Sequence, residues 1–137
     1  MNDKELIAKV NSAMYHQCRI RGYAAPVDVM MDIGVLSKQK YEDWRFGRAA
    51  FLEGVCTVNL RKLSLVMHQM RSYAVKENLK ASVCCYKRWG KHKTMSLRFS
   101  KSGNPDIEKW YATHFVDTVK TAQLKMEKEK ENSVSEQ

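Results

Sequence analysis

Residues 80–101 constrain the fold more than any other stretch, because they combine a β-strand pattern with an unbalanced charge. The segment contains seven Lys and Arg residues and no Asp or Glu. The whole chain of 137 residues has a formal net charge of +9, so this one segment supplies +7 of it. The basic excess is therefore local, and it requires a local explanation.

The same segment is predicted to form a β-hairpin. Residues 81–89 are rich in the β-formers Val, Cys, Tyr and Trp. Residues 95–100 alternate strictly between larger apolar and polar side chains, which gives a strand with two different faces. Residues 90–94 between them are short and polar enough for a hairpin loop. We expect one face to pack on the core, with a wet, cationic tip and Trp89 at its base.

A cationic hairpin suits a polyanion, since each Lys or Arg that neutralises a phosphate releases condensed counterions. The alternative is that lysines on an edge strand prevent sheet-to-sheet aggregation, but seven cations without an acid exceed that role. The pattern therefore predicts contact with nucleic acid. The predicted contact residues are Lys87, Arg88, Trp89 (as a base-stacking ring), Lys91, Lys93, Arg98 and Lys101 in the hairpin, and Lys38, Lys40, Arg45, Arg61 and Lys62 outside it.

The rest of the chain reads as helices with recognisable ends. Apolar residues recur at helical spacing, and capping residues and glycines mark the boundaries. Five helices are expected. The first begins after the cap Asn2 and ends at Gly22, the second covers 27–33, and the third begins after the cap Ser37. The fourth runs from Asn59 to about Asn78 and the fifth from Pro105 to about Leu124, and residues 49–55 are expected to form a further helical turn. The predicted fold is mainly α (α+β), with about five helices and one two-stranded antiparallel hairpin. Residues 1–124 form one globular domain, and the charged tail 125–137 is expected to fray or be disordered.

Two short helices joined by the turn at Gly34 outline a helix-turn-helix. The second of them offers Lys38, Lys40 and Arg45 to a phosphate backbone, although acidic residues share the same helix. Its aromatic residues, Tyr41, Trp44 and Phe46, are expected to anchor it to the core.

Together with the basic hairpin, this layout is partly like a winged helix. A winged helix places its wing directly after the recognition helix, and here the preceding helix is 59–78. Under that alternative Arg61 and Lys62 would lie on the reading helix. Both alternatives stay open at the level of sequence.

Composition excludes several classes of protein. No run approaches the roughly 18 apolar residues of a membrane span, and no apolar signal segment is visible, so a cytoplasmic location is expected. The four cysteines lack metal-ribbon or redox spacing, which favours reduced thiols. No metal or cofactor is predicted.

Catalytic motifs are absent from the sequence, so no catalytic residue is assigned. The four histidines are dispersed. His114 is a candidate general base, near Tyr111 and Asp117 on one expected helix, but a hydrogen-bonded packing role is favoured for it. An enzyme is the less favoured interpretation.

Three segments, 41–48, 97–103 and 111–114, resemble parts of small, functionally uncharacterised basic bacterial proteins. The resemblance covers most of residues 20–117. It implies a bacterial cytosolic origin and implies no activity.

The leading functional interpretation is a non-enzymatic nucleic-acid-binding domain, with DNA favoured over RNA and a regulatory role as one option. The alternative is a protein-interaction module that docks on an acidic partner, and a nuclease using His114 ranks third. Homodimerisation is a further option, and no membrane contact is expected.

Overall fold

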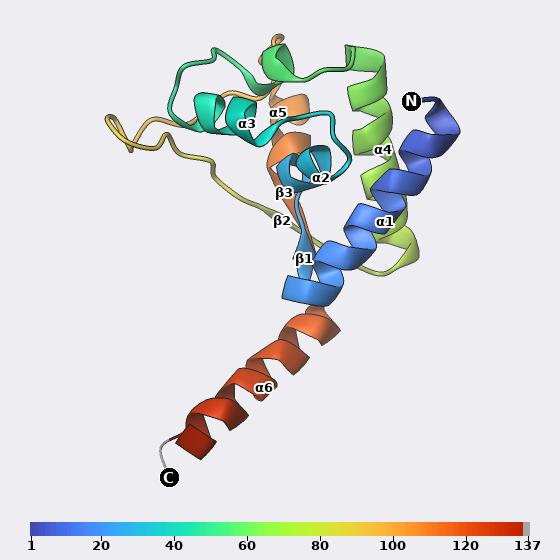
Figure 1. Ribbon diagram of the computed structural model, residues 1–137, viewed down its shortest axis with the longest axis vertical. Coiled ribbons are helices and arrows are strands. Elements are labelled where there is room, and N and C mark those ends of the chain that lie inside the picture. Colours follow the sequence, from blue (N-terminus) through green and yellow to red (C-terminus); the bar gives the residue numbers. More distant parts are fainter. Residues whose placement is uncertain (136–137) are drawn as a thin grey trace.

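The computed structural model describes residues 1–135, which form six α-helices and a three-stranded antiparallel sheet (Figure 1). With 59% of residues helical, the predicted α+β class is confirmed. The elements in chain order are α1 (Asp3–Arg21), β1 (Tyr23–Ala24), α2 (Pro26–Asp32), α3 (Lys38–Arg45), the 3-10 helix η1 (Leu52–Val55), α4 (Leu60–Lys76), β2 (Lys80–Val83), α5 (Pro105–Ala112), β3 (Thr113–Val116) and α6 (Thr118–Ser135).

The predicted helix starts are confirmed, because capping is decided by neighbouring residues. The side chains of Asn2, Ser37 and Asn59 each accept a hydrogen bond from the backbone N–H three residues later, at 2.8, 3.1 and 3.0 Å. Pro26 opens α2, whose Ala25 cap makes no side-chain hydrogen bond. Gly22, at φ +84°, ends α1 in a left-handed conformation that a glycine adopts without strain.

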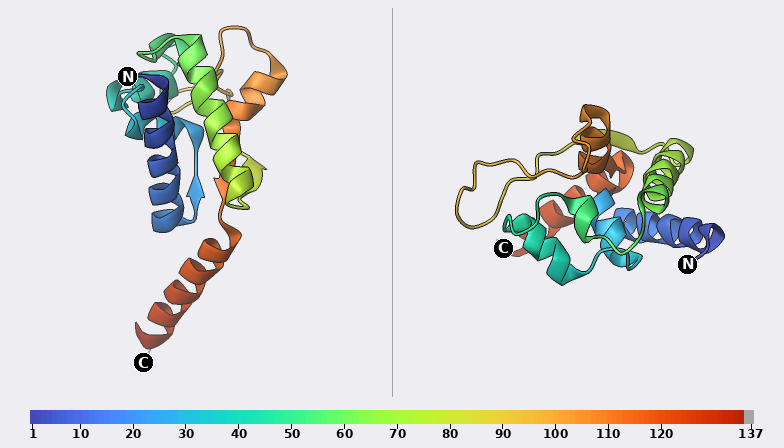
Figure 2. Two further views of the ribbon diagram at one scale, coloured as in Figure 1. Left: turned by 90° about the vertical axis from the view of Figure 1, so that its right-hand side faces the viewer. Right: turned by 90° about the horizontal axis from the view of Figure 1, so that it is seen from above.

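The core lies between α1, α4 and the sheet, and one face of α2 packs into it. Figures 1 and 2 show α1 and α4 side by side along one edge of the molecule. Pro26, Val27, Val29 and Met30 of the short helix α2 are buried, while Asp28, Met31 and Asp32 lie on its outer face. The main apolar contributors are Leu6, Val10 and Met14 from α1, Val27, Val29 and Met30 from α2, and Leu63, Val66 and Met70 from α4.

The sheet corrects the sequence prediction in two places. Strand β3 is central, and it pairs antiparallel with β1 on one side and β2 on the other. Residues 80–83 therefore pair with 113–116, and not with the second half of the predicted hairpin. The single helix expected from Pro105 to Leu124 is also wrong, since α5 ends at Ala112 and α6 begins at Thr118. Thr113, Phe115 and Val116 are strand formers, and their strand buries Phe115 in the core.

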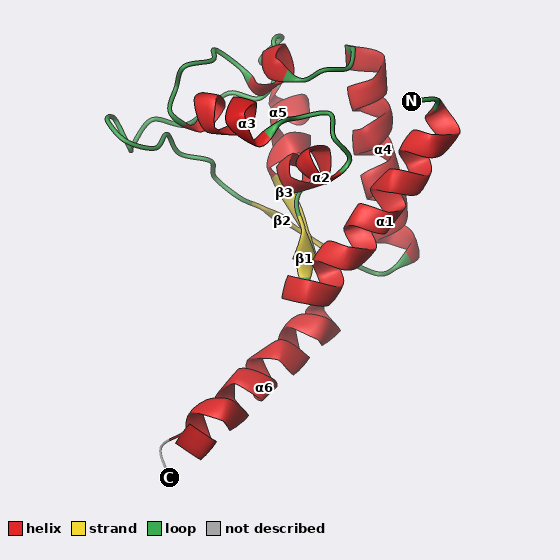
Figure 3. Ribbon diagram, in the orientation of Figure 1, coloured by secondary structure: helices red, strands yellow, loops and turns green. Residues whose placement is uncertain are grey.

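Residues 84–97, which we call the basic arm, leave the sheet as an irregular ribbon drawn as loop in Figure 3. The arm folds back on itself in the antiparallel sense that the sequence predicts. Leu97 N–H donates to Tyr86 O and Arg88 N–H to Met95 O, both at 2.9 Å, around a single bridge between Lys87 and Ser96. Regular strands over 84–89 and 95–100 are not formed, so the prediction of a two-stranded hairpin is wrong in that respect.

Helix α6 extends away from the body, and Figures 1 and 2 show this in each side view. It continues to Ser135, well past the point where the sequence pattern loses its apolar stripe. The prediction that the chain frays from about Lys128 refers to motion in solution, so it stays a prediction. The domain boundary predicted at residue 124 also stays a prediction. The last two residues of the predicted tail, 136–137, lie outside the described residues.

Trp44 joins α3 to the return of the arm. Its side chain is fully buried, with ring centroids 5.1 Å from Phe99 and 5.8 Å from Tyr86. Its indole Nε1–H donates to the backbone O of Arg98 at 2.8 Å. The core-anchoring role predicted for this residue is therefore confirmed.

We expect Trp44→Phe to lower the free energy of unfolding by about 2 kcal/mol, because the smaller ring leaves a cavity and removes the indole donor. Urea denaturation measures this loss. Trp110→Phe is the control, since Trp110 is 42% exposed and should lose less than about 1 kcal/mol. Equal losses in the two variants would contradict the central role of Trp44.

Candidate nucleic-acid interface

The basic arm extends from the body beside α3 (Figures 1 and 2). Its tip, residues 91–94, is exposed. The arm is attached to α3 through the backbone, since Trp89 N–H donates to Arg45 O at 2.7 Å. The structure thus brings the predicted hairpin and the C-terminal end of the predicted third helix into one surface.

Trp89 is the side-chain anchor of this attachment. Its ring meets Tyr41 and Phe46 edge-on, at centroid distances of 5.7 and 5.6 Å. The guanidinium carbon of Arg45 lies 4.5 Å from the indole centroid. The side chain is still 37% exposed, so base stacking stays a prediction for the open part of a ring that mainly packs on protein.

Two arginines pack at the junction between the arm and α3. Arg45 lies over both Trp89 and Tyr86, the latter with its centroid 5.2 Å away. Arg88 lies against Gly47, where an added Cβ would come within 2.6 Å of the guanidinium. Gly47 also has φ +76°, so close approach and backbone conformation both require glycine there.

The lysines of the arm have no acidic partner. The salt bridges found in residues 1–135 pair Arg21 with Asp28, Arg48 with Asp43, and Arg61 and Lys62 with Asp3, so none involves residues 80–101. Lys91 and Lys93 are exposed, and no hydrogen bond from either side chain is present in this part of the chain. Lys87 crosses the ribbon, donating to Thr94 O and Ser96 Oγ at 3.3 Å.

Lys38 and Lys40 are exposed in the first turn of α3, at the opposite end of that short helix from Arg45. Acidic Glu42 and Asp43 are half-buried on the same helix, and Asp43 is bonded to Arg48 at 3.2 Å.

Other predicted contact residues are occupied or lie elsewhere. Arg98 turns back on its own backbone, donating from Nε to Ser100 O at 2.7 Å and from Nη2 to Lys101 O. Arg61 and Lys62 bind Asp3 at 3.0 and 2.5 Å. These bonds hold the pKa of the Asp3 carboxyl well below its usual range. The pair lies at the start of α4 near the N-terminus, on the opposite side of the molecule from the arm (Figures 1 and 2).

Two carboxylates that sequence reasoning missed fix the base of the arm. Glu108 accepts from Phe99 N–H at 3.0 Å and from both Ser100 N–H and Oγ at 2.6 and 2.7 Å. Glu53 accepts from Lys101 N–H at 2.8 Å. Because these carboxylates bind backbone amides, they orient the base of the arm without bonding to its cationic side chains. Glu53 and Glu108 are far in the sequence from the amides that they bind, so no local sequence pattern indicates these contacts.

His114 lies on β3 and not on a helix, which corrects its expected setting. Its Nε2 is 2.8 Å from the Tyr86 hydroxyl, and its ring stacks on Tyr23 with centroids 5.4 Å apart. Tyr111 instead donates to Glu53, and Asp117 caps α6 through Lys120 N–H. The contacts agree with the packing role favoured from sequence.

Metal-ligating clusters of three or more His, Cys, Asp or Glu side chains do not occur within residues 1–135. The four cysteines are free thiols. Burial raises the pKa of Cys56 to about 12 and that of Cys18 to about 11, so these two thiols are poor nucleophiles near neutral pH.

In the described part of the chain, no helix is long and apolar enough to cross a membrane. Searches of protein-family models, curated proteins and solved structures found no match to this chain. The resemblance to small bacterial proteins stays a prediction.

Trp89→Ala should detach the arm from α3, because it removes two aromatic contacts and the surface under Arg45. We expect the amides of Arg88 and Trp89 to exchange with solvent at least tenfold faster, measured by hydrogen exchange and NMR. Trp89→Phe keeps an aromatic ring and is expected to show a smaller increase. Unchanged protection in Trp89→Ala would contradict the anchoring role.

Burial of His114 lowers its pKa below the ordinary value of 6.5. The unfolded chain therefore binds more protons than the folded one just below pH 6.5, so stability should fall as the pH is lowered through that range. Urea unfolding at pH 7.0 and 5.5 measures the fall, which should be smaller in His114→Gln. His68→Gln, at an exposed position on α4, is the matched control for the loss of one histidine. An unchanged pH dependence in His114→Gln would contradict the effect of burial.

Proposed function

We propose that this is a cytosolic, non-enzymatic nucleic-acid-binding protein that contacts phosphates through the basic arm, with DNA favoured over RNA. The observation that carries the proposal is the lack of acidic partners for the arm. Within residues 1–135, none of the seven cations of segment 80–101 takes part in a salt bridge. Lys87, Arg88 and Arg98 bond to or pack on the fold. Lys91 and Lys93 make no such contact within residues 1–135, so their charge is free to meet a phosphate.

The form of the arm suits a phosphate backbone. Lys91 and Lys93 lie at the exposed tip of the arm with free side chains, while Arg45 and Arg88 pack where the arm meets α3. The packed guanidinium groups can orient a phosphate by directed hydrogen bonds, and the flexible lysines add positive charge without a fixed geometry. Each phosphate neutralised on duplex DNA contributes about 0.9 to the slope of log K against log salt.

Of the two helices considered as readers, α3 is favoured over α4. Arg45 of α3 touches the arm, whereas Arg61 and Lys62 of α4 are already paired with Asp3. The partial likeness to a winged helix is then one of spatial arrangement only. The arm packs on α3, but in the sequence it follows α4. We propose that α3 and the arm act as one binding surface.

Fluorescence anisotropy titrations against duplex DNA, single-stranded DNA and structured RNA, each at 50 and 200 mM salt, test the proposal. We expect binding at low salt that weakens steeply at high salt, and the ranking of the three probes identifies the preferred nucleic acid. No binding to any probe at 50 mM salt would overturn the proposal and favour an acidic protein partner.

The charge-reversal pair Lys91→Glu/Lys93→Glu should weaken binding at least tenfold. It should also flatten the salt dependence, by about 0.9 in slope for each duplex phosphate that the arm no longer neutralises. The matched control is Lys125→Glu/Lys128→Glu, which makes the same change in net charge at exposed positions on α6. Equal weakening in the two variants, or unchanged affinity in the arm variant, would show that the arm is not the contact surface.

A further inference from the structure

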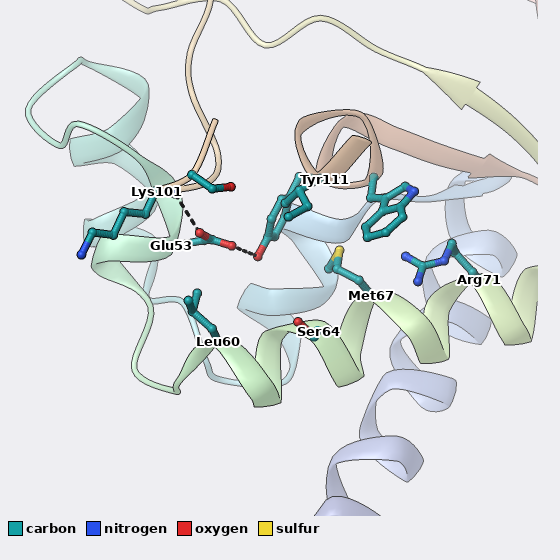
Figure 4. Close-up of a pocket in the computed structure, with 10 residues that line it drawn as sticks. Glu53, Leu60, Ser64, Met67, Arg71, Lys101 and Tyr111 are labelled. Atoms are coloured by element: carbon teal, nitrogen blue, oxygen red, sulfur yellow. Dashed lines mark hydrogen bonds between the residues drawn. The ribbon is translucent and has the colours of Figure 1, made fainter. Parts of the chain in front are cut away.

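A pocket of about 560 Å³ lies away from the tip of the arm, between α4, α5, η1 and the turn at 101–102 (Figure 4). Its volume falls within the range of small-molecule sites in proteins. Most of the wall is apolar, and it comes from Leu60, Met67, Ile107 and Trp110. Leu60 is 55% exposed and Trp110 is 42% exposed, so this apolar wall is open to solvent.

The polar groups of the pocket are not balanced in charge. In the part of the chain that the structure describes, its lining contains two cations, Arg71 and Lys101, and one acid, Glu53. Both oxygens of Glu53 are engaged, one by Lys101 N–H and the other by the Tyr111 hydroxyl, each at 2.8 Å. Burial and the neighbouring carboxylate raise the pKa of Tyr111, which keeps this hydroxyl a neutral donor to Glu53.

Arg71 is the residue of the pocket lining that carries a covered N–H without a partner in the described residues, as Arg45 and Arg88 do beside the arm. Its guanidinium stacks on Trp110, with the central carbon 4.3 Å from the ring centroid. Its Nη1 is covered from solvent but has no hydrogen-bond partner within residues 1–135. A covered guanidinium N–H without an acceptor is costly. In the described part of the chain no acid pairs with Arg71, so a carboxylate bound in the pocket is the partner that suits this guanidinium best.

Figure 4 shows Arg71 and Lys101 at opposite ends of the pocket, with Leu60, Ser64 and Met67 along α4 between them. A ligand that spans this wall meets apolar surface along its length and a cation at its end. Arg71, Met67 and Trp110 also line a second hollow of about 200 Å³, so the stacked pair separates two cavities.

We propose that this pocket binds a small amphipathic carboxylic acid, with its apolar body against Trp110 and Met67 and its carboxylate on Arg71. The pocket lies away from the exposed tip of the arm, although it shares Lys101 with the predicted phosphate contacts, and the proposal does not depend on nucleic-acid binding. The acid supplies the missing anionic partner of Arg71 and covers exposed apolar surface, two gains that a neutral ligand of the same shape does not combine.

The test uses 4-phenylbutyrate as the probe and 4-phenylbutanamide as its neutral match, each titrated into the full chain and followed by ¹H–¹⁵N NMR. We expect saturable shifts at the Trp110 indole and at residues 64–71, with the amide binding roughly ten- to a hundredfold more weakly. Arg71→Met keeps the apolar stem and should lose affinity for the acid by the same factor. Lys76→Met, an exposed change of the same type on α4, should leave affinity unchanged.

Ser64→Leu provides a second variant at an exposed helical position, where it fills the pocket with little risk to the fold. We expect it to abolish binding of the acid while leaving the urea midpoint near that of wild type. Equal affinity for acid and amide, equal affinity in Arg71→Met and wild type, or shifts that map outside the pocket would overturn the proposal. Absence of saturable shifts in the wild type would overturn it as well.

Discussion

The backbone of residues 98–101 is the connection on which the rest of this structure depends. Arg98 O accepts from the Trp44 indole at 2.8 Å and from Leu52 N–H at 3.2 Å. The next three amides donate to the carboxylates of Glu108 and Glu53. Groups from α3, η1 and α5 thus meet on a segment that has no regular secondary structure of its own. Such a segment is stable only because its polar groups are satisfied by distant parts of the chain.

This connection explains how a long irregular arm can be held in one direction. Phe99 is buried beside Trp44 and stacks on Tyr111, so the arm enters the core where its backbone is most tightly bonded. Near the other end of the ribbon, Trp89 packs on Tyr41 and Phe46. Between these two anchors the ribbon makes few ladder hydrogen bonds, and the side chains of its tip, residues 91–94, face solvent.

The same arrangement separates the charges of the protein. Glu53 and Glu108 serve backbone amides at the base of the arm, and Asp3 is occupied by Arg61 and Lys62 at the far side of the molecule. These three acidic side chains therefore bond to groups outside the arm, and the arm keeps its positive charge. Lys101 lies where the base of the arm and the pocket meet, since its amide binds Glu53 and the residue is part of the pocket lining. Two surfaces of different chemistry thus share one structural base.

Local sequence determined the helix starts, the left-handed glycine turns and the basic character of 80–101, since capping, backbone strain and composition depend on neighbouring residues. It also indicated that Trp44 is buried, because an aromatic residue on a short charged helix has no other place to pack. Only the tertiary structure decided that residues 80–83 pair with 113–116, and that residues 113–117 leave the helical pattern. The apolar spacing at 107, 111 and 115 fits one continuous helix as well as a helix followed by a strand. Tertiary packing therefore decides between these two structures. The assignments of Glu53, Glu108 and Arg71 were equally beyond the sequence, because each depends on groups brought together from segments far apart in the chain.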